Sequence, residues 1–123
     1  MKRLLVAIAL ILAFQGNVLA DLLRPGLWKN DKGSTLQITS VSPNGTVRGV
    51  FTNHAQGFGC QGIPYPANGK TSMVLTTFRV NFTACQTVTT WQGTVAWYGF
   101  PTTWLLVHQG RTQTGSDFFY RVN

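Results

Sequence analysis

Short runs in which side chains of two kinds alternate are the feature that most restricts the fold of this chain. The clearest is TVTTW at residues 87–91, which as a strand places two threonines and Trp91 on one face. Residues 102–106 and 49–53 also combine an aromatic ring with hydroxyl or amide groups on one face. An unpaired hydroxyl in a sealed core costs about 1–3 kcal/mol. Such mixed faces are typical of the walls of a small-ligand pocket.

Glycines, prolines and polar turn residues divide the rest of the chain into runs of strand length. We expect strands over residues 28–30, 35–41, 46–53, 68–72, 73–80, 87–97, 102–109 and 116–122. The longest irregular stretch should be the loop over residues 54–66. Residues 110–115 should form another loop. This pattern predicts an all-β domain, an eight-stranded antiparallel up-and-down β-barrel of the size that holds one small ligand.

The first 20 residues have the pattern of a secretory signal peptide. Lys2 and Arg3 precede an apolar run over residues 4–14, and small or aliphatic residues end the segment at Ala20. A membrane anchor is the alternative, but a helix that spans a bilayer needs about 20 apolar residues. We therefore expect a signal peptide over residues 1–20, a single domain over residues 21–123, and a secreted, extracellular or periplasmic, protein.

The charges of the chain exclude some classes of function. The formal net charge is +7, but the basic residues after the signal occur singly and form no cluster or basic helix. This is a weak footprint for nucleic acid, and we expect neither a nucleic-acid nor a membrane partner. The chain contains no glutamate, so a paired-carboxylate catalytic site would have only three aspartates available.

Cys60 and Cys85 are the only cysteines. Export to an oxidising compartment makes a disulfide between them the default expectation, worth roughly 3 kcal/mol of stability in the chain-entropy model. Zinc is not expected, because no paired-histidine pattern accompanies the cysteines. His54 and His108 lack a motif partner and are interpreted as solvated polar residues. A secreted hydrolase would need a nucleophile, a base and an orienting group, which this pattern does not supply, so we do not expect an enzyme.

Four short motifs of the sequence together resemble those of the avidin and streptavidin family of biotin-binding proteins. They are WKNDKGS at residues 28–34, TTWQG at 89–93, TWLL at 103–106 and GSDFF at 115–119, in the order and near the spacing of the family. The loop NHAQGFGC at residues 53–60, followed by PYP, is more specifically similar to the dimeric bacterial, rhizavidin-like branch. That branch has cysteines at the positions of Cys60 and Cys85, and the resemblance implies a homodimer, with assembly of dimers into larger oligomers left open.

The resemblance implies a biotin site with assigned roles. Asn30 and Ser34 should donate hydrogen bonds to the ureido oxygen, and Asp117 should accept one from a ureido N–H. Thr89 should contact the thioether sulfur. The third donor of the family is a tyrosine, whereas this chain has Phe51 at that position. The loss of one donor is worth roughly 1–3 kcal/mol, or about five- to a hundredfold in affinity.

The remaining implied contacts are a carboxylate subsite and an aromatic box. Asn53 and Thr87, with backbone amides of the loop from Ala55 to Gly57, should meet the valeryl carboxylate. The box should contain Trp91, Trp104 and Phe78, with Leu106 beside them. Phe78 stands where the family usually has tryptophan.

Each of these residues also has a purely structural interpretation. The aromatic residues would then be ordinary barrel core, the threonines plain strand formers, and Asn30 and Ser34 turn residues. We favour the pocket and expect a secreted, non-catalytic biotin-binding protein that needs no cofactor. The alternative is the same barrel binding a different small ligand, or a biotinylated peptide, with weakened affinity for biotin.

Overall fold

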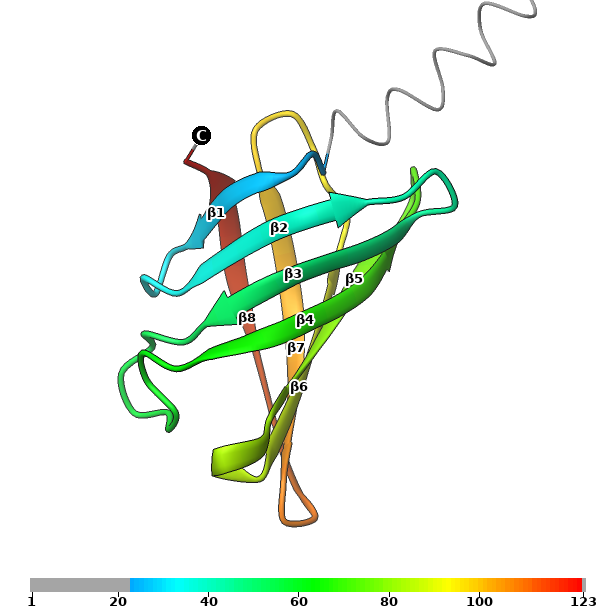
Figure 1. Cartoon of the computed structure of the whole chain (residues 1–123). Helices are drawn as coiled ribbons and strands as arrows, with labels where there is room; N and C mark the ends of the chain where they lie inside the picture. The colour runs from blue at the N-terminus through cyan, green and yellow to red at the C-terminus, as the bar shows by residue number, and fades with distance from the viewer. Residues whose placement is uncertain (1–22, 123) are drawn as a thin grey trace, which may run out of the picture.

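The chain folds into a closed barrel of eight antiparallel strands, in which β8 returns to pair with β1 (Figure 1). The structure is a computed structural model that describes residues 23–122. The predicted up-and-down barrel is confirmed. The predicted signal peptide lies outside the described residues. No helix within residues 23–122 is long and apolar enough to cross a membrane. The elements are β1 (Gly26–Asn30), β2 (Thr35–Val41), β3 (Thr46–Thr52), β4 (Pro64–Thr71), β5 (Thr76–Phe82), the 3-10 helix η1 (Thr83–Cys85), β6 (Thr87–Gly93), β7 (Phe100–His108) and β8 (Arg111–Arg121).

The interior of the barrel is built from the inward-facing alternate residues of the strands. In β5, for example, Thr76, Phe78, Val80 and Phe82 are buried and the residues between them are more exposed. Burial of each large aromatic ring removes about 150–250 Å² of surface from water, and this burial supplies much of the stability of such a small core. The buried hydrophobic cluster contains Leu23, Trp28, Leu36, Ile38, Val47, Phe51, Tyr65, Ala67, Phe78, Val80, Phe82, Trp91, Val95, Phe100 and Phe119.

The connections between up-and-down strands alternate between the two ends of the barrel. We call one end the mouth end; its connections are residues 31–34, 53–63, 83–86 and 109–110. We call the other the closed end; it contains residues 42–45, 72–75 and 94–99 and the first and last described residues (Figure 1). Phe100 and Phe119 pair across β7 and β8 next to this end and are completely buried, so the barrel is filled there.

The long loop at the mouth end is fastened to the barrel. Cys60 in the loop is disulfide-bonded to Cys85 in η1, as predicted, with the two Cα atoms 6.0 Å apart. Within the loop, the Gln61 side-chain amide donates to the carbonyl of Ala55 at 2.9 Å. Asn53 and Gln61 also form an isolated bridge. These contacts hold the loop against the mouth instead of leaving it free in solvent.

The predicted loop over residues 110–115 is wrong, because β8 begins at Arg111. The turn before it consists only of Gln109 and Gly110, both with positive φ, at 49° and 77°. Such two-residue turns favour residues that tolerate this conformation. The first residues of β8 are polar and exposed, so they carry no apolar alternation that would have indicated a strand.

Three other predicted boundaries are wrong by three or four residues. β4 begins at Pro64, inside the predicted loop. Residues 64–66 pair with β3 only, since the pairing with β5 starts at Ala67, and prolines are tolerated in a strand segment without a second neighbour. β5 begins at Thr76 instead of residue 73, because residues 72–75 form its turn with β4. β6 ends at Gly93, four residues before the predicted end.

Candidate ligand-binding site

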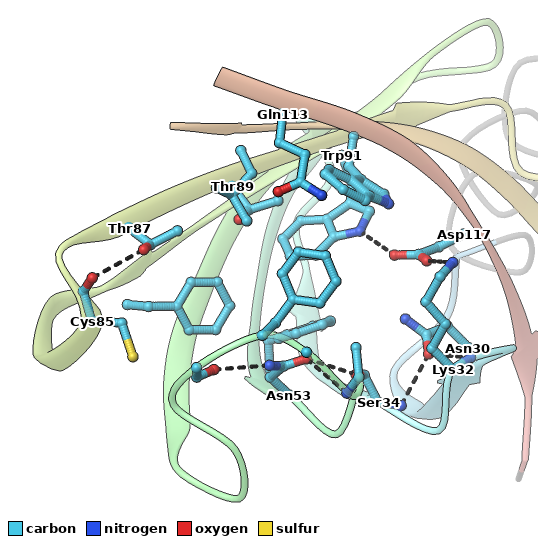
Figure 2. Close-up of a pocket in the computed structure, with 18 of the residues that line it drawn as sticks. Asn30, Lys32, Ser34, Asn53, Cys85, Thr87, Thr89, Trp91, Gln113 and Asp117 are labelled. Carbon is cyan, nitrogen blue, oxygen red and sulfur yellow. Dashed lines mark hydrogen bonds and ion pairs between the residues drawn. The ribbon is translucent and has the colours of Figure 1, made fainter. Parts of the chain in front are cut away.

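A cavity of about 310 Å³ opens at the mouth end of the barrel (Figure 2). Its size is at the lower end of the range typical for small-molecule sites. It is lined by Asn30, Lys32, Ser34, Phe51, Asn53, Ala55, Gly57, Phe58, Gly59, Phe82, Cys85, Thr87, Thr89, Trp91, Trp104, Leu106, His108, Gln113 and Asp117. The structure thus brings together all of the predicted site residues except Phe78. They come from β1, β3, β6, β7, β8, the turn between β1 and β2, and the loop over residues 53–63.

The turn between β1 and β2 presents Asn30 and Ser34 to the cavity. The side-chain oxygen of Asn30 accepts the backbone N–H groups of Lys32 at 3.1 Å and of Ser34 at 2.9 Å. Both Asn30 and Ser34 are buried. Because the Asn30 oxygen is used by the turn, its amide N–H groups are the part of this side chain that can donate to a ligand.

Ser34 connects this turn to the long loop. Its hydroxyl donates to the side-chain oxygen of Asn53 at 3.2 Å and accepts the backbone N–H of His54 at 2.9 Å. The side-chain amide of Asn53 donates to the carbonyl of Gly59 at 3.0 Å, and its oxygen also accepts the N–H of Ala55. Asn53 is therefore engaged on both sides in shaping the loop, so the Ser34 hydroxyl must rotate away from it to donate to a ligand.

Asp117 supplies a carboxylate on the opposite side of the cavity. The indole N–H of Trp91 donates to one carboxylate oxygen at 2.8 Å, and the other oxygen forms an ion pair with the ammonium of Lys32. The hydroxyl of Thr102 fixes the adjacent backbone by donating to the carbonyl of Asp117 at 2.8 Å. The side chain of Asp117 is only 6% exposed. A buried carboxylate held in this way is a strong, preorganised acceptor for a ligand N–H.

Lys32 is a cation beside this carboxylate that sequence reasoning missed. Its side chain is 38% exposed, and a second carboxylate, that of Asp31, lies 3.7 Å from its nitrogen. Partial burial acts to lower the pKa of Lys32, but the hydrogen bond to Asp117 and the charges of Asp117 and Asp31 together outweigh it. The pKa is therefore raised above its ordinary 10.5, and the ammonium stays charged throughout the neutral range.

Aromatic rings form the walls of the cavity. The ring of Phe51 lies 4.7 Å from that of Trp91, measured between centroids. Trp104 has the edge of Phe58 against it, at 5.9 Å and an interplanar angle of 90°. Trp104 also lies so close to Gly115 that a Cβ on this glycine would come within 2.3 Å of the indole. Phe58 belongs to the long loop, so this loop adds an aromatic side chain to the walls that was not predicted.

Phe78 does not line the cavity, contrary to the prediction for the aromatic box. Its ring stacks flat behind Trp91, with centroids 4.7 Å apart and planes at 9°, and it also packs against Phe119. Its position early in β5, near the closed end, places it one layer deeper than the walls. Its role is to support Trp91 from behind.

The rim of the cavity contains a second polar cluster. The hydroxyl of Thr87 donates to the carbonyl of Cys85 at 3.0 Å and lies 3.1 Å from Nδ1 of His108. The same ring nitrogen is 3.1 Å from the carbonyl oxygen of Gln86, so His108, interpreted from the sequence as a solvated polar residue, is half-buried and hydrogen-bonded at the rim. His54, in contrast, is exposed. Gln113 also lines the cavity; it was missed because it lies in the polar part of β8 that was predicted to be a loop.

Comparison with known proteins identifies the family. Residues 21–122 match the sequence profile of the Avidin family. The chain belongs to the avidin family. Avidin-family members are non-catalytic binding proteins, so the expectation that the chain is not an enzyme is confirmed. Among the described residues, no group of three or more histidine, cysteine, aspartate or glutamate side chains is arranged to hold a metal ion.

Individual members of the family support this assignment. The chain is 41% identical over 108 residues to afifavidin from Afifella pfennigii, which covers 78% of this chain and 67% of that protein. It is similar to the structure of the bradavidin2–biotin complex, with 46% identity, a TM-score of 0.77 and coverage of 80% of this chain and 97% of the other. The corresponding values for the rhizavidin–biotin complex are 32%, 0.76, 80% and 92%.

Proposed function

We propose that this chain binds biotin in the cavity at the mouth end. Two homologous avidins have been solved with biotin bound, and both share this barrel. The observation that carries the proposal is the polar arrangement of the cavity. Asn30 and Ser34 lie on one side, and Asp117, held by Trp91, lies on the other (Figure 2). A cyclic urea has one acceptor and two donors, so donors on one side and a fixed carboxylate on the other match it.

The test is calorimetric titration of oxidised protein comprising residues 21–123 with biotin. We expect one site per chain and a sub-micromolar dissociation constant, because the pocket is preformed and little ordering is needed on binding. A rise of the melting temperature with biotin should accompany the heat. If biotin in large excess produces neither heat nor a shift of the melting temperature, the proposal is wrong.

Lys32 should weaken the binding of biotin by occupying one oxygen of Asp117. We expect Lys32→Met to tighten binding about three- to tenfold, since one competing hydrogen bond is worth about 0.5–1.5 kcal/mol. The measurement is the dissociation constant by competitive titration. Lys29→Met is the matched control, because Lys29 lies on the outer face of β1 between buried Trp28 and Asn30 and has the same charge. Weaker binding by Lys32→Met alone would contradict this expectation and would mean that the ammonium donates to biotin itself.

A different small ligand is the second candidate, and two observations favour it. Phe51 brings no hydroxyl to the cavity, and Lys32 brings a positive charge. The missing hydroxyl leaves one donor fewer for a urea oxygen, and the ammonium favours a ligand whose ring carries an acceptor beside Asp117. Direct competition of candidate ligands against biotin distinguishes the two functions. A ligand that displaces biotin when present at a lower concentration than biotin would be the preferred ligand of the cavity.

We infer secretion from the N-terminal pattern, and the bonded cysteines support it. Disulfides persist in oxidising compartments outside the cytosol, and Cys60 and Cys85 are bonded in the fold. The exported protein should begin at Asp21 when its intact mass is measured. An intact mass that retains residues 1–20 would contradict this assignment.

We also infer that two copies associate through the outer faces of β6, β7 and β8. The outward residues in the middle of these strands form three uncharged rows across the sheet. The register aligns Val88–Val107–Thr112, Thr90–Leu105–Thr114 and Gln92–Thr103–Ser116. Leu105 and Val107 are 44% and 39% exposed, which is unusual for such residues without a partner. Light scattering after chromatography should give the mass of a dimer; the mass of a monomer at high concentration would contradict this inference.

A further inference from the structure

Exposed apolar side chains gather at the closed end of the barrel, opposite the ligand cavity. In the turn between β4 and β5, Met73, Val74 and Leu75 are 56%, 77% and 46% exposed. In the connection between β6 and β7, Trp97 is 92% exposed and Tyr98 is 58% exposed. These apolar side chains are in contact with water and are not needed for the packing of the barrel. They form an exposed apolar surface that is suited to binding a partner.

The two connections are held together as one structural unit. The hydroxyl of Thr94 in the second connection donates to the carbonyl of Val74 in the first at 2.6 Å. Tyr98 stacks on Phe118 of β8 with planes at 6°, and Trp97 meets Tyr98 edge to face. The exposed apolar side chains therefore stand on two connections that these contacts hold in place; we call these connections the apolar tips.

Basic residues lie at both ends of the barrel, the closed end included. Arg24 and Arg121 lie at the closed end, where the guanidinium of Arg121 donates to the carbonyls of Arg24 at 3.0 Å and Pro25 at 2.9 Å. They border a hollow of about 250 Å³ whose other walls include Trp97 and Tyr98. Lys70 lies one residue before the end of β4, at the same end.

The acidic groups lie away from this surface. The two acidic residues among residues 23–122, Asp31 and Asp117, are both beside the ligand cavity and share Lys32. Within residues 23–122, the closed end thus combines apolar tips with basic side chains and no acidic side chain.

We propose that the closed end docks on the surface of a membrane containing anionic phospholipids. Tryptophan and tyrosine favour the boundary between headgroups and acyl chains, and apolar residues on narrow tips enter that boundary more readily than they fit a flat protein surface. Arginine and lysine beside them would pair with lipid phosphates. In this orientation the mouth of the ligand cavity faces away from the membrane. The sequence predicted no membrane partner, because the segments that form this surface are far apart along the chain.

A second copy of the chain is the alternative occupant of this surface. The uncharged rows on β6, β7 and β8 suit an interface between copies better, because two copies joined at the closed end would bring the positive charges of Arg24, Lys70 and Arg121 together. The membrane is therefore the occupant that both the apolar tips and the charges favour.

The test is co-sedimentation of oxidised protein of residues 21–123 with vesicles; these residues contain every strand of the closed barrel. We expect binding to vesicles of phosphatidylcholine with phosphatidylglycerol, little binding to pure phosphatidylcholine, and weakening by salt. Val74→Asp and Trp97→Ser should each reduce the partition coefficient about tenfold or more. Ile63→Asp is the matched control, because Ile63 is 44% exposed but lies in the loop at the mouth end.

Three results would overturn the proposal. The first is no binding to anionic vesicles by the wild-type protein. The second is an equal loss for Ile63→Asp, which would mean that the closed end is not the contact. The third is a change of oligomeric mass for Val74→Asp without an effect on vesicles, which would assign the surface to a second copy. The melting temperature, measured on the same samples, shows that each variant is folded, and neither this control nor the vesicle result depends on which ligand the cavity takes.

Discussion

Asp117→Asn is expected to weaken biotin binding by about 10- to 150-fold. A hydrogen bond to a charged group contributes about 1.5–3 kcal/mol, and the ligand N–H would lose a charged acceptor. The variant also leaves the ammonium of Lys32 without its buried charged partner. The indole N–H of Trp91 then faces an amide group, one end of which donates instead of accepting. The measurement is competitive titration with biotin, together with the melting temperature of the free protein.

The control for Asp117→Asn is Asp31→Asn. Asp31 is exposed, lies 3.7 Å from the same ammonium, and uses its side chain to accept the backbone N–H of Phe118, a bond that asparagine retains. We expect this variant to change affinity less than about threefold, since exposed ion pairs contribute little. Equal effects of the two variants would mean that net charge near the cavity, and not the fixed carboxylate, determines the affinity.

Replacing Cys60 and Cys85 together by serine is expected to lower the free energy of unfolding by about 3 kcal/mol. The disulfide closes a loop with a sequence separation of 25 and restricts the unfolded chain by that amount in the entropic model. For a domain of this size the loss corresponds to a fall in melting temperature of about 12–24 °C. Thermal unfolding followed by circular dichroism measures it.

The disulfide should also affect ligand binding, because it joins the loop to the rim of the cavity. The loop carries Phe58 and the backbone around Ala55 and Gly57, and Cys85 itself lines the cavity. We expect the double serine variant to bind biotin more weakly and the wild-type protein to behave like it after reduction. Addition of reductant to the double variant is the control and should change nothing. Wild-type protein that keeps its melting temperature after complete reduction would show that the bond contributes no stability.

Much of the barrel could be predicted from local patterns, because the alternation of a strand is a property of adjacent residues. Residues 87–91 and 102–106 place Trp91 and Trp104 inward, and the register indeed pairs these two tryptophans across β6 and β7. Strand ends were predicted less well. The polar start of β8 and the prolines of β4 lie in strands because neighbouring strands hold them there, and no local pattern expresses that.

Within the site, the residues predicted from the sequence belong to recognisable motifs or strand patterns, whereas the missed residues have no local signal of their role. Asn30, Ser34 and Asp117 belong to recognisable motifs of the sequence, and all three line the cavity. Lys32 stands in the first of those motifs but was not assigned a role, because a lysine in a polar turn is usually solvated. Its position is decided by β8, whose Asp117 is 85 residues away in the sequence.

The sequence by itself determined which residues alternate, where most turns form and which side chains face the interior, since these depend on backbone geometry over a few residues. Only the tertiary structure decided depth and proximity. It placed Phe78 behind Trp91, brought Lys32 to Asp117, and gathered the turns over residues 72–75 and 94–99 at the closed end. These contacts form because the pairing of β8 with β1 closes the barrel and fixes the distances between segments that are far apart in the sequence. The residues that make the contacts have no local sequence pattern that predicts them.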